Sequence, residues 1–227
     1  NSYSIRFNFE SAGNLLYVLS KMSNLKKNDQ DEYTILNIPY AQYIKGDLDF
    51  AKNIVIDNRN SIAFHIGGGI AIPYGNARMI PFEKRYFSGG ANSVRGWSVR
   101  SLGPGTFSDE KGNFMNQSGD IKLDASIEYR TRLFWKFRGA LFVDAGNIWT
   151  IREYQDQPGG KFKFDQFYKQ IAVAYGVGLR LDLDFFVLRF DGGMKAINPE
   201  KGKDRYPILR SDFGRDFAFH FAVGYPF

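Results

Sequence analysis

The chain of 227 residues has no cysteine and only two histidines, His65 and His220, which excludes disulfides, thiolate metal sites and cysteine nucleophiles and disfavours a multi-histidine metal centre. Its formal net charge is +6, but the basic residues are scattered, so we expect no nucleic-acid partner. No run approaches the roughly 18 apolar residues of a membrane helix, which excludes a helical membrane protein.

Strict alternation of apolar and polar residues is the main pattern of the chain, and it predicts β-strands. In Gly119–Leu133 the odd positions are almost all apolar, whereas the even positions carry charged and small polar side chains. The same test predicts eight strands in chain order: Ser2–Met22, Ile38–Ile56, Ser61–Tyr74, Gly119–Leu133, Phe137–Trp149, Gln170–Asp184, Phe186–Ala196 and Phe217–Phe227.

The connections between these segments alternate in length. Asp57–Asn60 and Phe134–Lys136 are short, whereas Ser23–Ile35, Gly75–Ser118 and Thr150–Lys169 are long and polar. Short turns at one end and long loops at the other are typical of outer-membrane barrels, and the strands are long enough to cross a bilayer at a tilt. We therefore predict an all-β, antiparallel transmembrane β-barrel in a bacterial outer membrane, with the lipid bilayer as a partner.

A soluble sandwich or a lipocalin-like barrel is the alternative, because alternation does not say whether the apolar face points inward. The polar face carries bulky ions that suit a wide, wet lumen, so the pattern favours lipid on the apolar side. These ions are Glu128, Arg130, Asp144, Arg180, Asp182, Arg189 and Asp191.

The long connection Gly75–Ser118 contains a recognisable motif. Its residues Val94, Arg95, Gly96 and Trp97 resemble the VRG[F/Y/W] motif of the outer-membrane assembly-factor superfamily, which includes BamA, TamA and two-partner secretion translocators. A predicted strand and a glycine-rich approach precede the motif, and five alternating segments follow it, which makes the resemblance specific.

The resemblance implies a sixteen-stranded barrel in which this loop folds back into the lumen. Residues 1–227 would then be the C-terminal part of the barrel, with the preceding strands and the periplasmic POTRA repeats as missing partners. The start of the chain in mid-pattern at Asn1 fits a fragment or a mature region. The segments Tyr86–Gly90, Leu102–Gly105 and Gly224–Phe227 look most like the TamA-like lipoprotein branch of Bacteroidota.

The resemblance also implies that Arg95 contacts two acidic residues on the lumen wall, Glu128 and Asp144. Alternation places both carboxylates on the polar face. A guanidinium between two carboxylates would pin the loop, Gly96 would allow a tight turn, and Trp97 would act as an apolar plug. The alternative is that Arg95 is one of many loop arginines and that the acids merely solvate the lumen.

The last predicted strand resembles the signal by which outer-membrane proteins are recognised for assembly; the alternative is simply a lipid-facing strand. Ala222 departs from the glycine that is usual at its position. Pro226 cannot donate a ladder hydrogen bond and Gly224 packs little, so we hypothesise that both weaken a seam with the first strand. The expected members of the signal and seam are His220, Ala222, Gly224, Tyr225, Pro226 and Phe227.

The function implied is insertion of client outer-membrane proteins, without enzymatic chemistry, cofactor or metal. Neither His65 nor His220 belongs to a nucleophile–base pattern, and both are expected to be lumen histidines. Two alternatives remain. One is a secretion translocator for an unfolded passenger, and the other is a self-contained eight-stranded structural or adhesin-like barrel.

Overall fold

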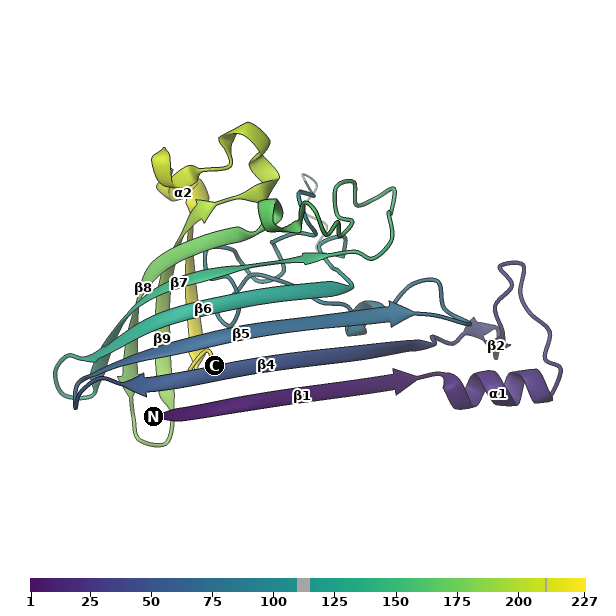
Figure 1. The fold of residues 1–227 in the computed structure, drawn as a ribbon, viewed down its shortest axis with the longest axis horizontal. Coiled ribbons are helices and arrows are strands. Elements are labelled where there is room, and N and C mark those ends of the chain that lie inside the picture. Colours follow the sequence, from purple (N-terminus) through teal and green to yellow (C-terminus); the bar gives the residue numbers. More distant parts are fainter. Residues whose placement is uncertain (110–114, 211) are drawn as a thin grey trace.

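A single antiparallel sheet of eight strands dominates the computed structural model, which describes residues 1–109, 115–210 and 212–227 (Figure 1). The eight strands follow one another across this sheet in the order in which they occur in the chain, so the sheet is a meander, and the predicted number of strands is confirmed for it. The strands are β1 (Ser2–Ala12), β4 (Tyr43–Val55), β5 (Asn60–Pro73), β6 (Ile121–Arg132), β7 (Phe137–Trp149), β8 (Ala172–Asp182), β9 (Val187–Ile197) and β10 (Phe217–Val223).

Small elements occupy the long connections. A two-stranded hairpin, β2 with β3, lies in the connection between β1 and β4. Within the described ranges, no helix is long and apolar enough to cross a membrane. The small strands are β2 (Thr34–Ile35) and β3 (Ile38–Pro39), the helices are α1 (Asn14–Met22) and α2 (Phe213–Asp216), and the 3-10 turns are Phe82–Lys84, Phe167–Gln170, Pro199–Asp204 and Pro207–Leu209.

The register of the sheet separates an apolar outer face from a polar inner face. Phe64 in β5 pairs with Ile127 in β6, which pairs with Val143 in β7, so apolar side chains line up across the strands. Glu128 and Asp144 project from the opposite, inner face, where the long connection between β5 and β6 packs. The sheet curves strongly from β1 to β10 (Figure 1), and these two edge strands form no ladder with each other, so the sheet is open.

The first predicted strand, Ser2–Met22, is wrong in its second half. The strand ends at Ala12, and Asn14–Met22 is helical. Gly13 makes the break: its φ is +81°, and a Cβ there would lie 2.2 Å from the Ala41 carbonyl oxygen, so only glycine fits. Beyond Gly13 the apolar residues recur at helical rather than alternate spacing.

Two other predicted strands are shorter than expected. The segment Ile38–Ile56 is interrupted after Pro39, and β4 begins only at Tyr43. The last strand ends at Val223 rather than Phe227, because Gly224 takes a left-handed conformation with φ +88° and the chain leaves the sheet.

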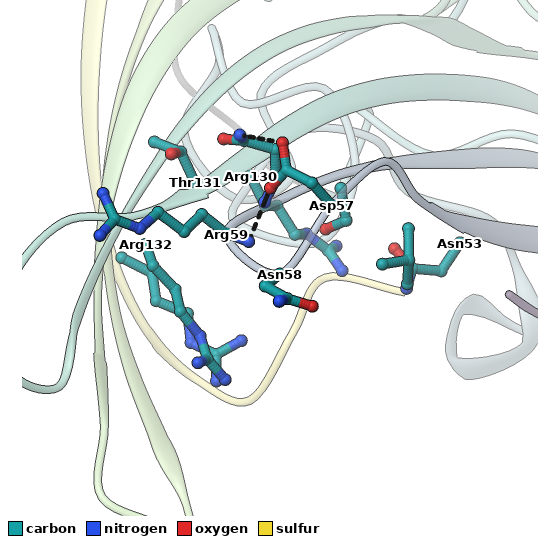
Figure 2. Close-up of a pocket in the computed structure, with 11 residues that line it drawn as sticks. Asn53, Asp57, Asn58, Arg59, Arg130, Thr131 and Arg132 are labelled. Atoms are coloured by element: carbon teal, nitrogen blue, oxygen red, sulfur yellow. Dashed lines mark hydrogen bonds between the residues drawn. The ribbon is translucent and has the colours of Figure 1, made fainter.

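The short turn between β4 and β5 is closed by Asp57 (Figure 2). Its carboxylate accepts hydrogen bonds from the backbone N–H of Arg59 at 2.7 Å and from the backbone N–H and side-chain amide of Asn60 at 2.9 and 2.8 Å. The hydrogen bonds from Asn60 and Arg59 lower the pKa of Asp57. Arg130 and Arg132 line a pocket beside this turn, at the short-turn mouth of the inner face.

Candidate functional site

Arg95 is the centre of a buried charge cluster that joins the long loop to the sheet. Its Nε and Nη2 atoms donate to the two carboxylate oxygens of Asp144 at 2.8 and 2.9 Å, and Nη1 donates to Glu128 Oε2 at 2.6 Å. The backbone N–H of Arg95 also donates to Asp144, at 3.0 Å. The guanidinium lies 3.5 Å from the centre of the Phe142 ring and is only 1% exposed. Such a bidentate, charge-assisted contact fixes both the position and the orientation of the loop.

The cluster continues into β8 and β9. Arg180 donates to Glu128 Oε2 at 3.0 Å and to Asp191 Oδ1 at 2.6 Å, and all three side chains are fully buried. Arg189 lies 3.1 Å from Asp191 and donates to the carbonyl oxygen of Ala91, in the loop, at 2.8 Å. The wall of the inner face therefore presents alternating charges, so that the loop arginine enters an already paired network.

Small residues let the loop approach the sheet backbone. A Cβ at Gly193 in β9 would lie 2.2 Å from the Arg95 carbonyl oxygen, and a Cβ at Gly96 would lie 2.8 Å from the Cβ of Ala174 in β8. Beside them, Val94 and Trp97 pack with Leu102, Ala172 and Ala174 in a buried apolar cluster. Alanine and glycine on the inner faces of β8 and β9 thus leave the space in which the motif residues 94–97 pack.

Two further contacts hold the ends of the loop. The Tyr86 hydroxyl donates to Asp47 Oδ1 in β4 at 2.6 Å, and burial together with this bond raises the pKa of Tyr86. Asn147 in β7 donates its amide to the Gly105 carbonyl oxygen at 2.8 Å. The loop is therefore attached on both sides of Arg95, and residues 110–114 of the predicted loop 75–118 lie outside the described residues.

The C-terminal residues are divided between the sheet and the inner face. His220 in β10 donates a hydrogen bond from Nε2 to the Arg95 carbonyl oxygen at 3.0 Å. Ala222 lies opposite Arg189 in the pairing of β10 with β9. After Gly224 the chain turns inward: Arg130 lies over the Tyr225 ring at 4.5 Å, and the Phe227 ring stacks on His65 at 5.2 Å. Pro226 lines a small cavity with Phe227 and His65.

The predicted motif residues and their two predicted partners are thus brought together, with His220 added beside them. Tyr225 and Phe227 contact Arg130, and Phe227 also stacks on His65. Pro226 and Phe227 line the same small cavity as Arg95. Sequence reasoning placed Arg180, Arg189 and Asp191 on the polar face but assigned them no role in the cluster. Alternation revealed their side of the sheet; their pairing depends on the register between β8 and β9.

The electrostatics of the site favour a permanent ion cluster rather than proton transfer. Burial lowers the pKa of Arg95, but Asp144 and Glu128 more than offset this effect, so the net pKa is raised and the guanidinium stays charged. Within the described part of the chain, no three His, Asp or Glu side chains come together as a metal site. The arrangement is suited to holding a polypeptide segment in place.

Comparisons with known proteins extend this description. The model of the "Omp85 superfamily domain" matches residues 13–227. The chain is 30% identical over 183 residues to the outer membrane protein assembly factor BamA of Neisseria meningitidis, and 28% identical over 160 residues to the human sorting and assembly machinery component 50 homolog. The crystal structure of BamA from Haemophilus ducreyi lacking POTRA domains 1-3 superposes with a TM-score of 0.57 at 19% identity, which shows the common fold.

The matched regions are unequal in extent. They cover 71% of this chain but 21% of the Neisseria protein, and 65% of this chain but 33% of the human protein. The structural match covers 98% of this chain and 51% of the Haemophilus chain. No finding distinguishes a TamA-like branch, and that assignment stays a prediction. Because the family model spans nearly the whole sequence, the chain belongs to the Omp85 superfamily of outer-membrane β-barrel proteins.

Proposed function

We propose that this chain is the C-terminal half of the barrel of an outer-membrane protein insertion factor, in which residues 75–118 form a loop pinned inside the lumen. The observation that carries the proposal is the Arg95 cluster, which attaches the loop to β6 and β7 through Glu128 and Asp144. The relatives support the insertion role, since one is an assembly factor and another a sorting and assembly component.

The mechanism proposed is mechanical and breaks no covalent bond. With the loop fixed, the lumen wall from β6 to β9 is rigid, whereas the edge strand β10 keeps unpaired backbone groups. Such an edge can template an incoming strand by main-chain hydrogen bonds. Client outer-membrane proteins, the preceding barrel strands and the POTRA repeats are the proposed partners. The absence of enzymatic activity stays a prediction.

The test is client folding by the full-length protein that contains this sequence, reconstituted in lipid vesicles. A urea-unfolded outer-membrane protein is added, and its folded fraction is followed by the difference in gel mobility between unheated and boiled samples. We expect folding several-fold faster than in empty vesicles, and an Arg95→Ala variant that is slower. Arg95→Lys keeps the charge but loses the bidentate geometry, so its rate should lie between the two.

Two results would contradict the proposal. A client that is unfolded but protected from protease inside the vesicles would indicate a secretion translocator instead. Folding no faster than in empty vesicles, by a reconstituted protein whose own heat-modified mobility is normal, would argue against both activities and favour a structural barrel.

A further inference from the structure

Helix α1 carries its apolar side chains on the side that faces away from the protein. Leu15, Val18, Leu19 and Met22 recur at the i, i+3, i+4, i+7 spacing that places them in one stripe along the helix. Their exposed fractions are 72, 52, 49 and 76%. A helix on a water-exposed surface has the reverse arrangement, with its apolar stripe against the core, so this stripe needs an apolar neighbour outside the described residues.

The opposite side of α1 is fixed to the rest of the chain. Asn14 Oδ1 accepts hydrogen bonds from the Gln42 amide at 2.9 Å and from the Tyr74 hydroxyl at 2.6 Å. The Tyr17 ring packs edge-on against Tyr33, with ring centres 5.8 Å apart, and Ser20 is buried with its hydroxyl within 3.2 Å of Tyr40. These contacts hold the helix in one rotation about its axis, and that rotation directs the apolar stripe outward.

The stripe begins where the lipid-facing surface of β1 ends. The outward side chains of β1 are Tyr3, Ile5, Phe7 and Phe9, which are 65–75% exposed. A strand of eleven residues tilted by about 45° rises about 25 Å, which is the height of the apolar band of an outer-membrane barrel. Because only Gly13 separates β1 from α1, the helix starts at the rim of that band, on the long-loop side (Figure 1).

The charges on and after the helix fit the polar side of a bilayer. Lys21 is the only charged residue of α1 and lies in its last turn. Neither Lys21 nor Lys26 has an ion-pair partner among residues that the structure describes, and both are exposed. Long lysine side chains beside an apolar stripe reach anionic headgroups while their stems stay in the apolar layer.

We propose that α1 is an interfacial helix that lies in the outer leaflet, with Leu15, Val18, Leu19 and Met22 against lipid acyl chains. The argument rests on the continuity of the stripe with the lipid-facing surface of β1, and it does not depend on the insertion activity proposed above. The helix would anchor residues 13–42, the connection between β1 and β4, to the membrane surface.

Site-specific quenching tests the proposal. These 227 residues contain no cysteine that would compete for the label, and any cysteine elsewhere in the full-length protein is replaced by serine. The variants Leu15→Cys and Leu19→Cys of the full-length protein are reconstituted in phosphatidylcholine vesicles and labelled with bimane. The measurement is the quenching of bimane fluorescence by lipids that carry a nitroxide near the headgroup end of the acyl chain. Phe7→Cys in β1 is the lipid-facing reference and Asp29→Cys the aqueous one. We expect quenching at Leu15 and Leu19 at least twofold above that at Asp29, and weak quenching by aqueous iodide.

Either of two results would overturn the proposal. Iodide quenching equal to that at Asp29, without lipid quenching, would place the stripe in water. Protection from both quenchers would show that a polypeptide covers it, either another part of the protein or a second copy. Normal heat-modified mobility of each labelled protein ensures that the barrel is folded in every sample.

Discussion

The two ends of the sheet have the same alternating pattern of side chains, but their inner faces are buried to different extents. In β8, the inner residues Ala172, Ala174 and Arg180 are completely buried while the outer residue Val177 is exposed. In β1, every residue from Ser2 to Phe9 is exposed, so both faces of the strand are open. Two features contribute to the difference. The described part of the long loop packs on the inner face of β6 to β9 and reaches the other end through Lys84 and Tyr86, and β1 is also the free edge of the sheet.

Alternation in the sequence determines on which face of the sheet a side chain lies. Whether that face is buried depends on a segment distant in sequence, here the long loop between β5 and β6. Where the loop lies, charged side chains lose water and must be paired, which makes each partner costly to remove. Where it does not, similar pairs stay near solvent and contribute little. Substitutions of the same type at the two ends of the sheet should therefore have different effects.

Arg95→Ala should have the largest effect. It leaves Glu128 and Asp144 buried without their loop cation, which costs about 3–5 kcal/mol when one partner of a buried ion pair is removed. We expect a lower temperature for loss of the heat-modified gel band and faster protease cleavage within residues 75–118. Arg100→Ala, in the same loop but exposed over Phe87, is the matched control and should cost about 1 kcal/mol or less. Unchanged cleavage in Arg95→Ala would rule out the pinning role.

Asp191→Asn should come next. The change weakens the charge-assisted hydrogen bond from Arg180, a type of bond worth about 1.5–3 kcal/mol, and removes the ion pair with Arg189. Glu10→Gln removes the charge of a pair with Lys84 at 2.6 Å, but both side chains are about 40% exposed, so the loss should stay below about 1 kcal/mol. Urea titration of the two variants in the same detergent compares them; equal shifts would contradict the distinction between the two ends.

Gly193→Ala should have a smaller effect, because it adds only a methyl group. That group would lie 2.2 Å from the Arg95 carbonyl oxygen, so the loop backbone must shift, at a cost of about 1–2 kcal/mol. Gly46→Ala in β4 is the control, since a Cβ there has no neighbour within 4 Å. Protease cleavage of the loop provides the measurement, and cleavage of Gly193→Ala at the wild-type rate would show that the close approach is dispensable.

A pH effect at Glu200 should be the smallest. Burial raises the pKa of this carboxyl, which accepts hydrogen bonds from Gly103 and Ser108 and thus joins the loop to residues 197–216. Because the folded state then binds the proton more tightly than the unfolded state, stability should fall as pH rises from about 4.5, the ordinary value, through the raised pKa. Glu200→Gln should flatten this dependence in thermal unfolding scans; an identical slope in the variant would exclude Glu200 as its source.

Much of the sheet could be predicted from sequence because alternation is a local property. Predicted Phe137–Trp149 coincides with β7, and predicted Gly119–Leu133 differs from β6 by a few residues. Helix α1 was missed because the alternation test was carried across Gly13, whose left-handed conformation ends the strand. The spacing of Leu15, Val18, Leu19 and Met22 was the available signal for that helix.

The site could be predicted only in part. Arg95, Glu128 and Asp144 came from a motif together with the side on which alternation places the acids. The contact between Arg180 and Asp191 needs the register of β8 against β9, which places Gly178 opposite Asp191. The role of Gly193 depends on the approach of a loop that is distant in sequence. Neither the Arg180–Asp191 contact nor the role of Gly193 follows from a local sequence pattern.

The short length of β10 has a consequence for the lifetime of any strand that pairs with it. Only seven residues stay in the sheet before Gly224 turns the chain inward, compared with eleven in β9. A strand added along β10 would form only a few main-chain hydrogen bonds, each with a net value of about 1 kcal/mol. In the templating role proposed above, such a short junction would separate readily, which would favour release of the client strand.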